Sequence, residues 1–452
     1  MKRIKQFGFS DEQIAYLVQN DVTDDDVRAY RKGLDVTPTY QLVDTCAGEF
    51  PAQTPYFYSS YESVNESEAT DNEKVLILGS GPNRIGQGIE FDYSCVHGVK
   101  AAREMGYEAL MLNCNPETVS TDFDVADKLY FEPVYWERVL DVIEHEQPKG
   151  VIVQLGGQTA LKLAERFDKN DIPILGTSYE MMDLAESRGK FSEVLKQLEI
   201  PFPPYGMATT VEEAVATADE IGYPILIRPS YVLGGQGMRI AINRDEVAEY
   251  VRNILDIFPG NQILLDRFLD DAIELDVDSV SDGDETWIAG IMQHIEPAGV
   301  HSGDSTAVLP PYSLSETAEA SVRKYVTEIA QALDVRGLLN VQFVVKDDVV
   351  YVIEANPRAS RTVPFIAKAT GAPVSAIATK VMLGEKLQTF REQGLLDSHL
   401  EGYALKEPVF SWDKFPEVPK ELGPEMKSTG EAIAFVDALS DEHFQRPYEM
   451  KD

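Results

Sequence analysis

The sequence has few cysteines, few basic residues and no long apolar stretch, and each shortage excludes a class of protein. Only three cysteines occur in 452 residues, and none is close to another. This excludes a disulfide scaffold and a cysteine-based zinc site, and it favours a reducing compartment. No apolar run approaches the ~20 residues of a membrane span, and the opening MKRIKQFGFSDEQ lacks the apolar core of a secretory signal. We therefore expect a cytoplasmic protein that does not contact a membrane.

Basic residues are scarce relative to acidic ones. Forty Lys and Arg face 76 Asp and Glu, which leaves a formal net charge of −36. Such a charge repels nucleic acid and excludes it as a partner. Hydrophobic residues still make up 44% of the chain, so disorder is not the cause. Two interpretations stay open: adaptation to a salt-rich cytoplasm, where counterions screen the excess charge, or an ordinary acidic enzyme.

The length allows about three domains, and the local pattern changes along the chain accordingly. Residues 1–60 read as short amphipathic helices, because SDEQIAYLVQ and TDDDVRAYRKGL each open with a capping residue and an acidic first turn. The polar stretch SSYESVNESEATDNE then reads as a linker. After it, the apolar segments KVLILGS, ALMLNCN, GVIVQLGG and PILGTS alternate with amphipathic helices. This alternation predicts an α/β domain with a doubly wound parallel sheet.

A glycine-rich turn, GSGPNRIGQG, follows the first predicted strand of that sheet. Arg84 replaces the third glycine of the dinucleotide fingerprint, and no acidic residue ends the second strand, so NAD binding is excluded. The turn is either an anion site formed by backbone amides with Arg84, or only a tight connection from strand to helix.

From about residue 186 the sequence pattern changes, and residues that are candidates for ligand binding become more frequent. Arg228 ends a predicted strand before Gly234, Gly235 and Gly237, which either fold over phosphates or form a hairpin tip. Glu274 is either an acceptor for ribose hydroxyls or a solvated charge. His294, Glu296 and His301 raise the idea of zinc, but no further His or Cys supports it.

The stretch YVIEANPRASR, Tyr351 to Arg361, carries a carboxylate, an amide and two guanidinium groups after an apolar strand. Because side chains alternate along a strand, Glu354 and Asn356 share a face, and Val352 is expected to continue that row. Such oxygen donors suit Mg²⁺, with Arg358 and Arg361 just beyond it to hold a carboxylate or phosphoryl group. The alternative is a polar strand end with surface arginines.

A preceding strand, in NVQFVVKDDVVYVIE, carries Gln342 as a third oxygen donor. Gln342 shares a face with Glu354 only if the hairpin has a three-residue loop or a bulge. A plain two-residue Asp-Asp turn would separate the two side chains.

Several motifs in order resemble the second synthetase half of the carbamoyl-phosphate synthase large subunit. They are GSGPNRIGQGIEFDY, NCNPETVSTD, QLGGQT, RPSYVLGG, AGVHSGDS, NVQF and EANPRASRTVPF. The resemblance implies four segments: a helical part of the oligomerisation domain (1–70), a pre-ATP-grasp domain (71–185), an ATP-grasp α+β domain (186–395) and a C-terminal extension (396–452). The first synthetase half and the allosteric domain of that subunit are absent from the resemblance.

The resemblance also implies roles for individual residues. Arg188 and Arg228 would contact nucleotide phosphates, Glu274 the ribose, and Gly299, Val300, His301 and Ser302 the base and ribose. Arg267 and Leu269 would lie near the nucleotide. Gln342, Glu354 and Asn356 would bind Mg²⁺ or Mn²⁺, while Arg358 and Arg361, with Asn356, would serve catalysis. Arg267 and the segment GGQGM depart from the family pattern, which often has His at the former and GGRAM at the latter.

The implied reaction is ATP-dependent phosphorylation of carbamate to carbamoyl phosphate, for arginine and pyrimidine biosynthesis. The implied partners are the first synthetase half, a glutamine amidotransferase small subunit, and further copies joined through the N-terminal helical segment. Two rivals remain: another ATP-grasp carboxylate ligase, such as a biotin carboxylase relative, and a non-catalytic nucleotide-binding assembly module.

The charge excess yields a first prediction. Raising KCl from low to molar concentration should raise the thermal unfolding midpoint, because counterions screen repulsion among the excess carboxylates. Thermal melts across a KCl series measure this directly. A midpoint that stays flat or falls with salt contradicts the adaptation hypothesis.

Overall fold

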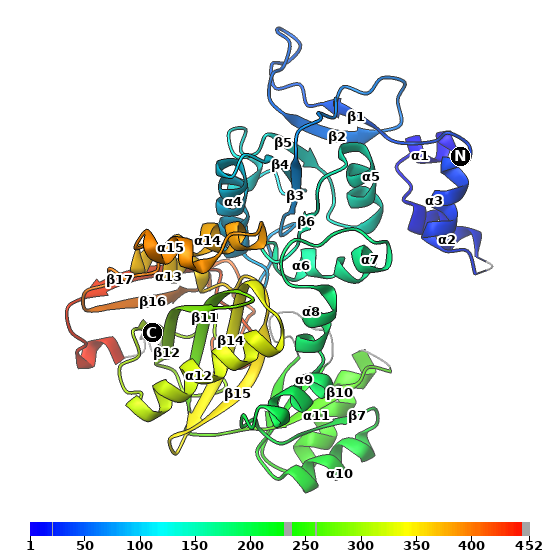
Figure 1. The fold of residues 1–452 in the computed structure, drawn as a ribbon. Helices are drawn as coiled ribbons and strands as arrows, with labels where there is room; N and C mark the ends of the chain where they lie inside the picture. Colours follow the sequence, from blue (N-terminus) through cyan, green and yellow to red (C-terminus); the bar gives the residue numbers. More distant parts are fainter. Residues whose placement is uncertain (20, 230–236, 258–259, 445–452) are drawn as a thin grey trace. The chain divides into compact units, whose positions relative to one another are not determined.

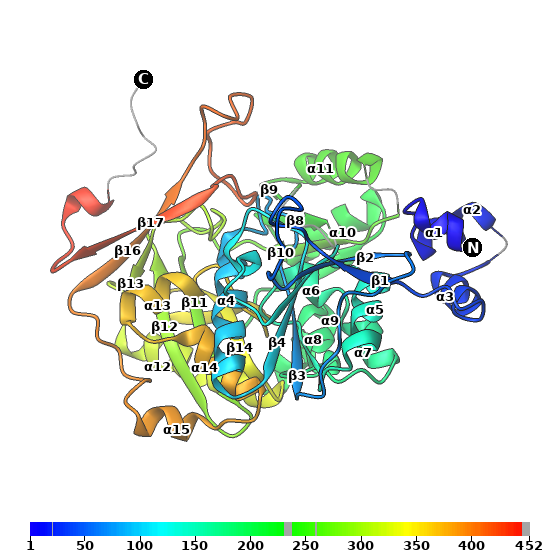
Figure 2. The same ribbon diagram turned by 90° about the horizontal axis from the view of Figure 1, so that it is seen from above.

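The computed structural model describes residues 1–19, 21–229, 237–257 and 260–444 (Figures 1 and 2). It divides into two compact units, Met1–Asn83 with Phe91–Leu175, and Arg84–Glu90 with Gly176–Asp452. The finer four-part division stays a prediction. Within the described ranges, no helix is long and apolar enough to cross a membrane.

The first unit begins with three short helices that start at the predicted capping residues. They are α1 (Lys2–Gln6), α2 (Asp11–Val18) and α3 (Asp24–Lys32). The Ser10 hydroxyl accepts from the Gln13 amide, and the Gln13 side chain accepts from the Ser10 amide. Thr23 and Asp26 form the same reciprocal pair at α3. These capping boxes satisfy amides that a helix start leaves unpaired.

The expectation of further helices up to residue 60 is wrong, because two strands follow α3. β1 (Thr39–Leu42) pairs antiparallel with β2 (Tyr56–Ser60). Their sequences, TYQL and YFYSS, are rich in aromatic and hydroxyl side chains that favour a sheet over a helix. The first two residues of the polar stretch SSYESVNESEATDNE belong to β2. Residues 61–73 have no regular structure, as expected of a linker, but they are anchored, since the Tyr40 amide donates to Asn65 (2.7 Å).

A six-stranded sheet forms the centre of the first unit, in the order β1-β2-β5-β4-β3-β6. Its other strands are β3 (Lys74–Leu78), β4 (Glu108–Asn113), β5 (Lys128–Phe131) and β6 (Val151–Ile152). Strands β2 to β6 run parallel, and the chain places β4 and β5 on one side of β3 and β6 on the other. This confirms the doubly wound sheet. The segment PILGTS contributes only one bridge, from Ile174 to Val151, and β5 was not predicted.

The remaining helices of this unit connect or follow the strands of the sheet. They are α4 (Ile89–Glu104), α5 (Trp136–Glu146), α6 (Gly157–Leu161) and α7 (Ala164–Lys169), with a short 3-10 turn at Val119–Thr121. α4 and α5 are helices of the kind expected between the apolar strands, and α5 covers the sequence WERVLDVIEHE.

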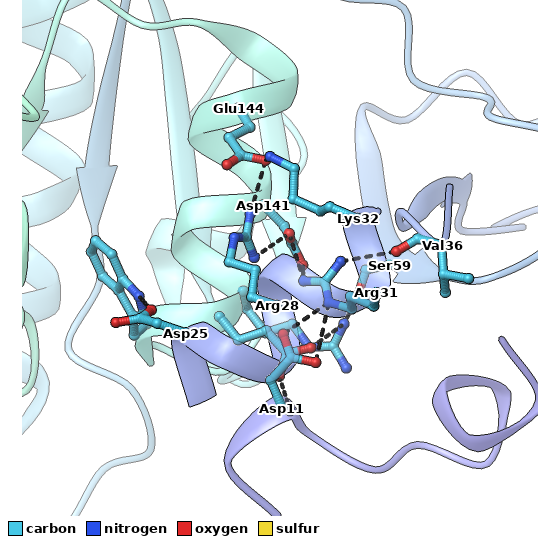
Figure 3. A network of polar contacts seen from close by, with 12 residues as sticks. Asp11, Asp25, Arg28, Arg31, Lys32, Val36, Ser59, Asp141 and Glu144 are labelled. Atoms are coloured by element: carbon cyan, nitrogen blue, oxygen red, sulfur yellow. Dashed lines mark hydrogen bonds and ion pairs between the residues drawn. The ribbon is translucent and has the colours of Figure 1, made fainter. Parts of the chain in front are cut away.

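A buried network of charges ties the N-terminal helices to α5 (Figure 3). Arg31 is fully buried and donates to both Asp11 (2.8 Å) and Asp141 (3.1 Å). Asp141 also pairs with Arg28 (2.7 Å), and Lys5 pairs with Asp11 (2.8 Å). Burial raises the pKa of Asp141, against the opposite effect of the two guanidinium groups. Because an unpaired buried charge is costly, each member depends on its partners.

The second unit contains a four-stranded antiparallel sheet in the order β7-β10-β8-β9. Its strands are β7 (Tyr205–Ala208), β8 (Ile225–Pro229), β9 (Arg239–Ala241) and β10 (Ile263–Arg267). Helices α10 (Val211–Ile221) and α11 (Arg244–Ile257) bury their apolar faces on it, in a core that includes Val215, Ile227, Val251 and Leu265.

A seven-stranded antiparallel sheet completes the second unit, in the order β15-β14-β11-β12-β13-β16-β17. β15 is labelled in Figure 1 and β13 in Figure 2. Its strands are β11 (Ile273–Asp282), β12 (Thr286–His294), β13 (Ala307–Leu309), β14 (Arg336–Lys346), β15 (Val349–Asn356), β16 (Tyr403–Val409) and β17 (Gly430–Val436). The accompanying helices are α8 (Tyr179–Glu186), α9 (Arg188–Gln197), α12 (Glu316–Ala332), α13 (Val363–Thr370), α14 (Val374–Met382) and α15 (Leu387–Glu392). A short 3-10 helix follows at Asp441–Phe444. These two sheets with their helices agree with the α+β class expected for this part of the chain.

The strands β11, β14 and β15 have one apolar and one polar face. Leu275, Val277, Val341 and Phe343 share a core with Val322, Val326 and Ile329 of α12. The intervening residues of β11 and β14 point to the other face and are polar: Glu274, Asp276, Asp278, Asn340 and Gln342. This second face carries most of the candidate site.

The charge network predicts a large stability loss from one substitution. Asp141→Asn keeps the side-chain shape but removes the charge that Arg28 and Arg31 share, so it should lower the free energy of unfolding by about 3 kcal/mol. Denaturant unfolding measures the change. As a control, Lys169→Ala removes an exposed pair with Glu165 (2.6 Å) and should cost less than about 1 kcal/mol. Equal effects of the two substitutions would contradict the prediction.

Candidate functional site

The hairpin of β14 and β15 brings the three predicted metal ligands together. Its loop is the two-residue turn Asp347–Asp348, with both residues at positive φ (51° and 66°), as a tight hairpin turn requires. Pairing shifts by one residue further along, so that Phe343 faces Val352 whereas Gln342 faces Glu354. Ile353 is therefore the extra residue of a β-bulge. The bulge alternative is confirmed, and it restores the shared face that the turn alone would prevent.

The same bulge overturns one expectation for this strand. Val352 lies opposite Phe343 in the apolar core and is fully buried, so it does not continue the row of Glu354 and Asn356. The reason is the extra residue, which reverses the alternation of faces between Val352 and Glu354.

The oxygen donors of this hairpin also contact one another and a neighbouring arginine. The Asn356 amide nitrogen donates to Glu354 (3.0 Å), and Arg358 donates to the amide oxygen of Asn356 (3.1 Å). A carboxylate with two amide oxygens is a donor set that suits a hard cation such as Mg²⁺. The residues therefore fit a metal, which would compete with Arg358 for the Asn356 oxygen.

Asp266, at the end of β10, holds the two predicted phosphate-contacting arginines side by side. It accepts from Arg188 (2.7 Å) through one oxygen and from Arg228 (2.7 Å) through the other. Arg188 also donates to the carbonyl of Ile353 (2.7 Å), the bulge residue. Arg228 lies 3.8 Å from Glu354. Burial alone would lower the pKa of Arg228, but Asp266 and Glu354 raise it. The arrangement places two fixed positive charges beside the oxygen donors.

Glu274 belongs to a buried acid–histidine cluster. His294 pairs with Asp276 (2.8 Å) through one ring nitrogen and with Glu274 (3.3 Å) through the other. The second Glu274 oxygen accepts from the backbone amide of Gly299 (3.3 Å). Burial alone would lower the pKa of His294, but the two carboxylates raise it to about 9. His294 is therefore a buried cation at neutral pH. Both of its ring nitrogens lie beside carboxylate oxygens, so neither is directed at a metal position.

The predicted loop from Gly299 to Ser302 starts at this cluster. Gly299 has φ +98°, and a Cβ there would lie 2.9 Å from the Phe268 ring, so only glycine fits. The His301 ring accepts from the Gly303 amide (3.0 Å), and burial lowers its pKa to about 3. The Ser302 carbonyl accepts from the buried Lys406 (3.2 Å). Val300 lies between these anchored residues.

Arg358 and Arg361 follow the hairpin as two partly buried cations. Burial lowers the pKa of both, although an arginine remains charged at neutral pH. Arg361 donates to the Gly86 carbonyl, while its Nε is buried without an acceptor in the described part of the chain. Arg361 also lines a small polar cavity with Lys406 and Glu431. Cations disfavoured by burial gain from a bound anion.

The structure places other predicted residues less directly. The Arg267 guanidinium donates to the Tyr223 carbonyl, and Leu269 follows β10 next to Phe268. Gly234 and Gly235 lie outside the described residues, whereas Gly237 is described and has φ +74°. Arg84 pairs with Gln87 through the backbone, and the anion site there stays a prediction. Throughout the described ranges, no three His, Cys, Asp or Glu side chains are grouped to hold a metal.

Sequence reasoning missed the residues that organise the site: Asp266, Asp276, Asp278 and Asn340. A signal was present, because Glu274, Asp276 and Asp278 alternate with apolar residues in IELDVDS. That alternation also occurs in strands with one solvated face, so it did not distinguish a buried polar face.

The His294 cluster predicts a pH dependence of stability. A histidine pKa raised from its ordinary 6.5 to about 9 stabilises the fold fully below pH 6.5, and this contribution is lost as pH rises through 9. It amounts to about 3 kcal/mol at most. The unfolding free-energy difference between wild type and His294→Asn should therefore shrink between pH 6.5 and 9. A difference that is constant across this window would contradict a charged His294.

Two family models match the chain. The carbamoyl phosphate synthase preATP-grasp domain matches residues 71–184, and the carbamoyl-phosphate synthase L chain, ATP binding domain, matches residues 187–390. The carbamoyl phosphate synthase large chain of Archaeoglobus fulgidus is 52% identical over 434 residues, covering 96% of this chain and 40% of that protein. The Pasteurella multocida large chain is 53% identical over 433 residues, with the same coverage. The chain thus spans about two fifths of the length of these curated relatives.

Solved structures share the fold at low sequence identity. The biotin carboxylase domain of Hydrogenobacter thermophilus 2-oxoglutarate carboxylase, solved with MgADP, ADP and bicarbonate, has a TM-score of 0.63 and 19% identity. The match covers 82% of this chain and 87% of that one. Biotin carboxylase from Campylobacter jejuni has a TM-score of 0.59 and 17% identity, covering 75% of this chain and 76% of that one. The fold is thus an ATP-grasp fold, and the family models together with the identity across nearly the whole chain show that this protein belongs to the family of carbamoyl-phosphate synthase large chains.

Proposed function

We propose that the chain phosphorylates carbamate with ATP, giving carbamoyl phosphate and ADP, as the second synthetase half of a glutamine-hydrolysing carbamoyl-phosphate synthase. The observation that carries this proposal is the bulge at Ile353. It sets Gln342 and Glu354 opposite each other, and its carbonyl anchors Arg188 beside Arg228. Oxygen donors for a cation and positive charges for phosphates thereby meet at one place, as phosphoryl transfer requires.

Gln342, Glu354 and Asn356 would hold Mg²⁺ or Mn²⁺, which when bound offsets the charge of nucleotide phosphates. Arg188 and Arg228 would hold those phosphates, and Glu274 would accept from the ribose hydroxyls. The loop Gly299–Ser302, with Arg267 and Leu269 nearby, would line the base and ribose. None of these groups forms a covalent bond with substrate, so their contribution is position and charge.

Arg358 and Arg361 would orient the carbamate and stabilise the charge that develops on the transferred phosphoryl group. Their partial burial supports this role, because it disfavours both cations until an anion is bound beside them. A planar guanidinium also matches a carboxylate-like anion through paired hydrogen bonds.

The proposal includes partners and location. The first synthetase half would supply carbamate, and a glutamine amidotransferase small subunit would supply ammonia. The N-terminal helices would join further copies, since they expose Phe7 (68%), Tyr16 (81%) and Leu17 (63%). The few cysteines and the lack of a long apolar helix in the described ranges support a cytoplasmic location.

The reverse partial reaction tests the function. Purified chain with carbamoyl phosphate and MgADP should form ATP, measured by a luciferase assay, because the second phosphorylation needs only the residues present here. Glutamine-dependent synthesis should require the first half and the small subunit. Efficient glutamine-driven synthesis by this chain alone would refute the half-enzyme proposal. Nucleotide binding without ATP formation would favour the assembly module.

Glu354→Ala tests the metal site within the same assay. It should lower ATP formation by about 100-fold, because several kcal/mol of charge stabilisation depend on the metal. The unfolding midpoint should change little. Glu319→Ala is the matched control, since Glu319 is an acid on α12, which covers the apolar face of the sheet. Losses of rate and stability that run in parallel would instead indicate a structural glutamate.

A further inference from the structure

Asp278 is a buried carboxylate that the proposed chemistry does not use. It lies on the polar face of β11, with 1% of its surface exposed. One oxygen accepts from the Asn340 amide of β14 (3.0 Å), and the other accepts from the Thr362 hydroxyl (2.5 Å). Asn340 lies two residues before Gln342 and directly opposite Asn356. Asp278 therefore joins the strand of the metal donors to the turn that carries Arg361.

The Thr362 side chain hydrogen-bonds to this carboxylate instead of capping the helix that begins after it. It occupies the N-cap position of α13, but its side chain makes no capping hydrogen bond. Its hydroxyl donates to Asp278 and also lies 2.8 Å from the Ser360 hydroxyl. The Thr362 amide donates to Ser360 as well (3.1 Å). The residues on both sides of Arg361 are thereby fixed.

The packing of α13 brings this turn close to the sheet. Gly290 of β12 lies directly opposite Asp278, and a Cβ there would lie 3.1 Å from Ile366 of α13. A larger residue at 290 would require the Ile366 side chain to shift. The close approach and the hydrogen bond to Thr362 therefore act together on the helix start.

An ionised carboxylate that is buried as deeply as Asp278 raises the free energy of the folded state. Burial raises the pKa of Asp278 to about 6, even though donated hydrogen bonds oppose the shift. Apolar residues of similar volume would often stabilise such a position better. The free-energy cost of burying Asp278 is accounted for by its hydrogen bond to Thr362, which fixes the turn that carries Arg361.

We propose that Asp278 is a positioning residue that, through Thr362, fixes the guanidinium of Arg361 relative to the metal donors of β14 and β15. This inference rests on the role proposed above for Arg361. In this proposal Asp278 does not contact the substrate. It fixes the turn of residues 360–362, and this turn determines the orientation of the Arg361 side chain.

Thr362→Val tests the link, with Thr362→Ser as its conservative partner. Valine keeps the volume but removes the donor to Asp278, so kcat for ATP formation from carbamoyl phosphate and MgADP should fall about 10- to 100-fold. The KM for MgADP should change less than about threefold, because the nucleotide contacts lie on other elements. Serine retains the hydroxyl and should restore most of kcat.

The same substitution is then made in an Arg361→Ala background. If Thr362 acts through Arg361, Thr362→Val should lower the residual kcat by less than about twofold there. Ser315→Ala serves as control, because Ser315 caps α12 by accepting from Ala318 (3.0 Å) away from the arginine turn. It should lower stability and leave kcat unchanged. If Thr362→Val does not fold, Asp278→Asn goes through the same cycle with the same expectations.

Three results would overturn the inference: an unchanged kcat in Thr362→Val, an equal loss in the Arg361→Ala background, or a rise in KM that accounts for the whole loss. Failure of wild type to form ATP would instead overturn the proposed function. Normal wild-type activity with an insensitive Thr362→Val variant would reject this inference alone.

Discussion

Burial of charge on one face of the β11-β14-β15 sheet is the constraint on which the site depends. Asp276 and Asp278 are almost wholly buried there, and such groups persist only when they are paired. Asp276 is paired with the cationic His294, and Asp278 accepts hydrogen bonds from Asn340 and Thr362. Each pairing ties β11 to another element. The need to satisfy these carboxylates thereby fixes the neighbouring strands and the start of α13.

The bulge at Ile353 determines which side chains of β15 lie on this charged face. Without it, Glu354 would lie with Val352 in the core, where a carboxylate has no partner. With it, Glu354 meets Gln342 and approaches Arg228. The bulge also leaves the Ile353 carbonyl to accept from Arg188. A single extra residue therefore brings the proposed cation donors together and gives the proposed phosphate-contacting Arg188 an acceptor.

Buried charge has a different role in the first unit. Arg31, Asp11 and Asp141 join the N-terminal helices to α5, and no feature of that network resembles a ligand site. Every charge there has an opposite partner within 3.2 Å. Guanidinium nitrogens that are buried without a hydrogen-bond acceptor among the described residues occur in both places, on Arg28 in this network and on Arg361 in the candidate site. The network in the first unit therefore differs from the candidate site in what it joins, which is one set of helices to another.

The sequence alone determined the class of fold, the capped helices α2 and α3, the parallel strands β3, β4 and β6, and the candidate ligands of the EANPR segment. These follow from local periodicity, capping residues and motifs, which act over a few residues. Tertiary structure decided which face each ligand occupies, because one bulge residue inverts the alternation and no local pattern marks it. It also decided that residues 39–42 and 56–60 form strands, since β2 gains its stability beside β5, far along the chain. The roles of Asp266 and Asp278 likewise exist only in the folded chain, because their partners lie 38 to 84 residues away.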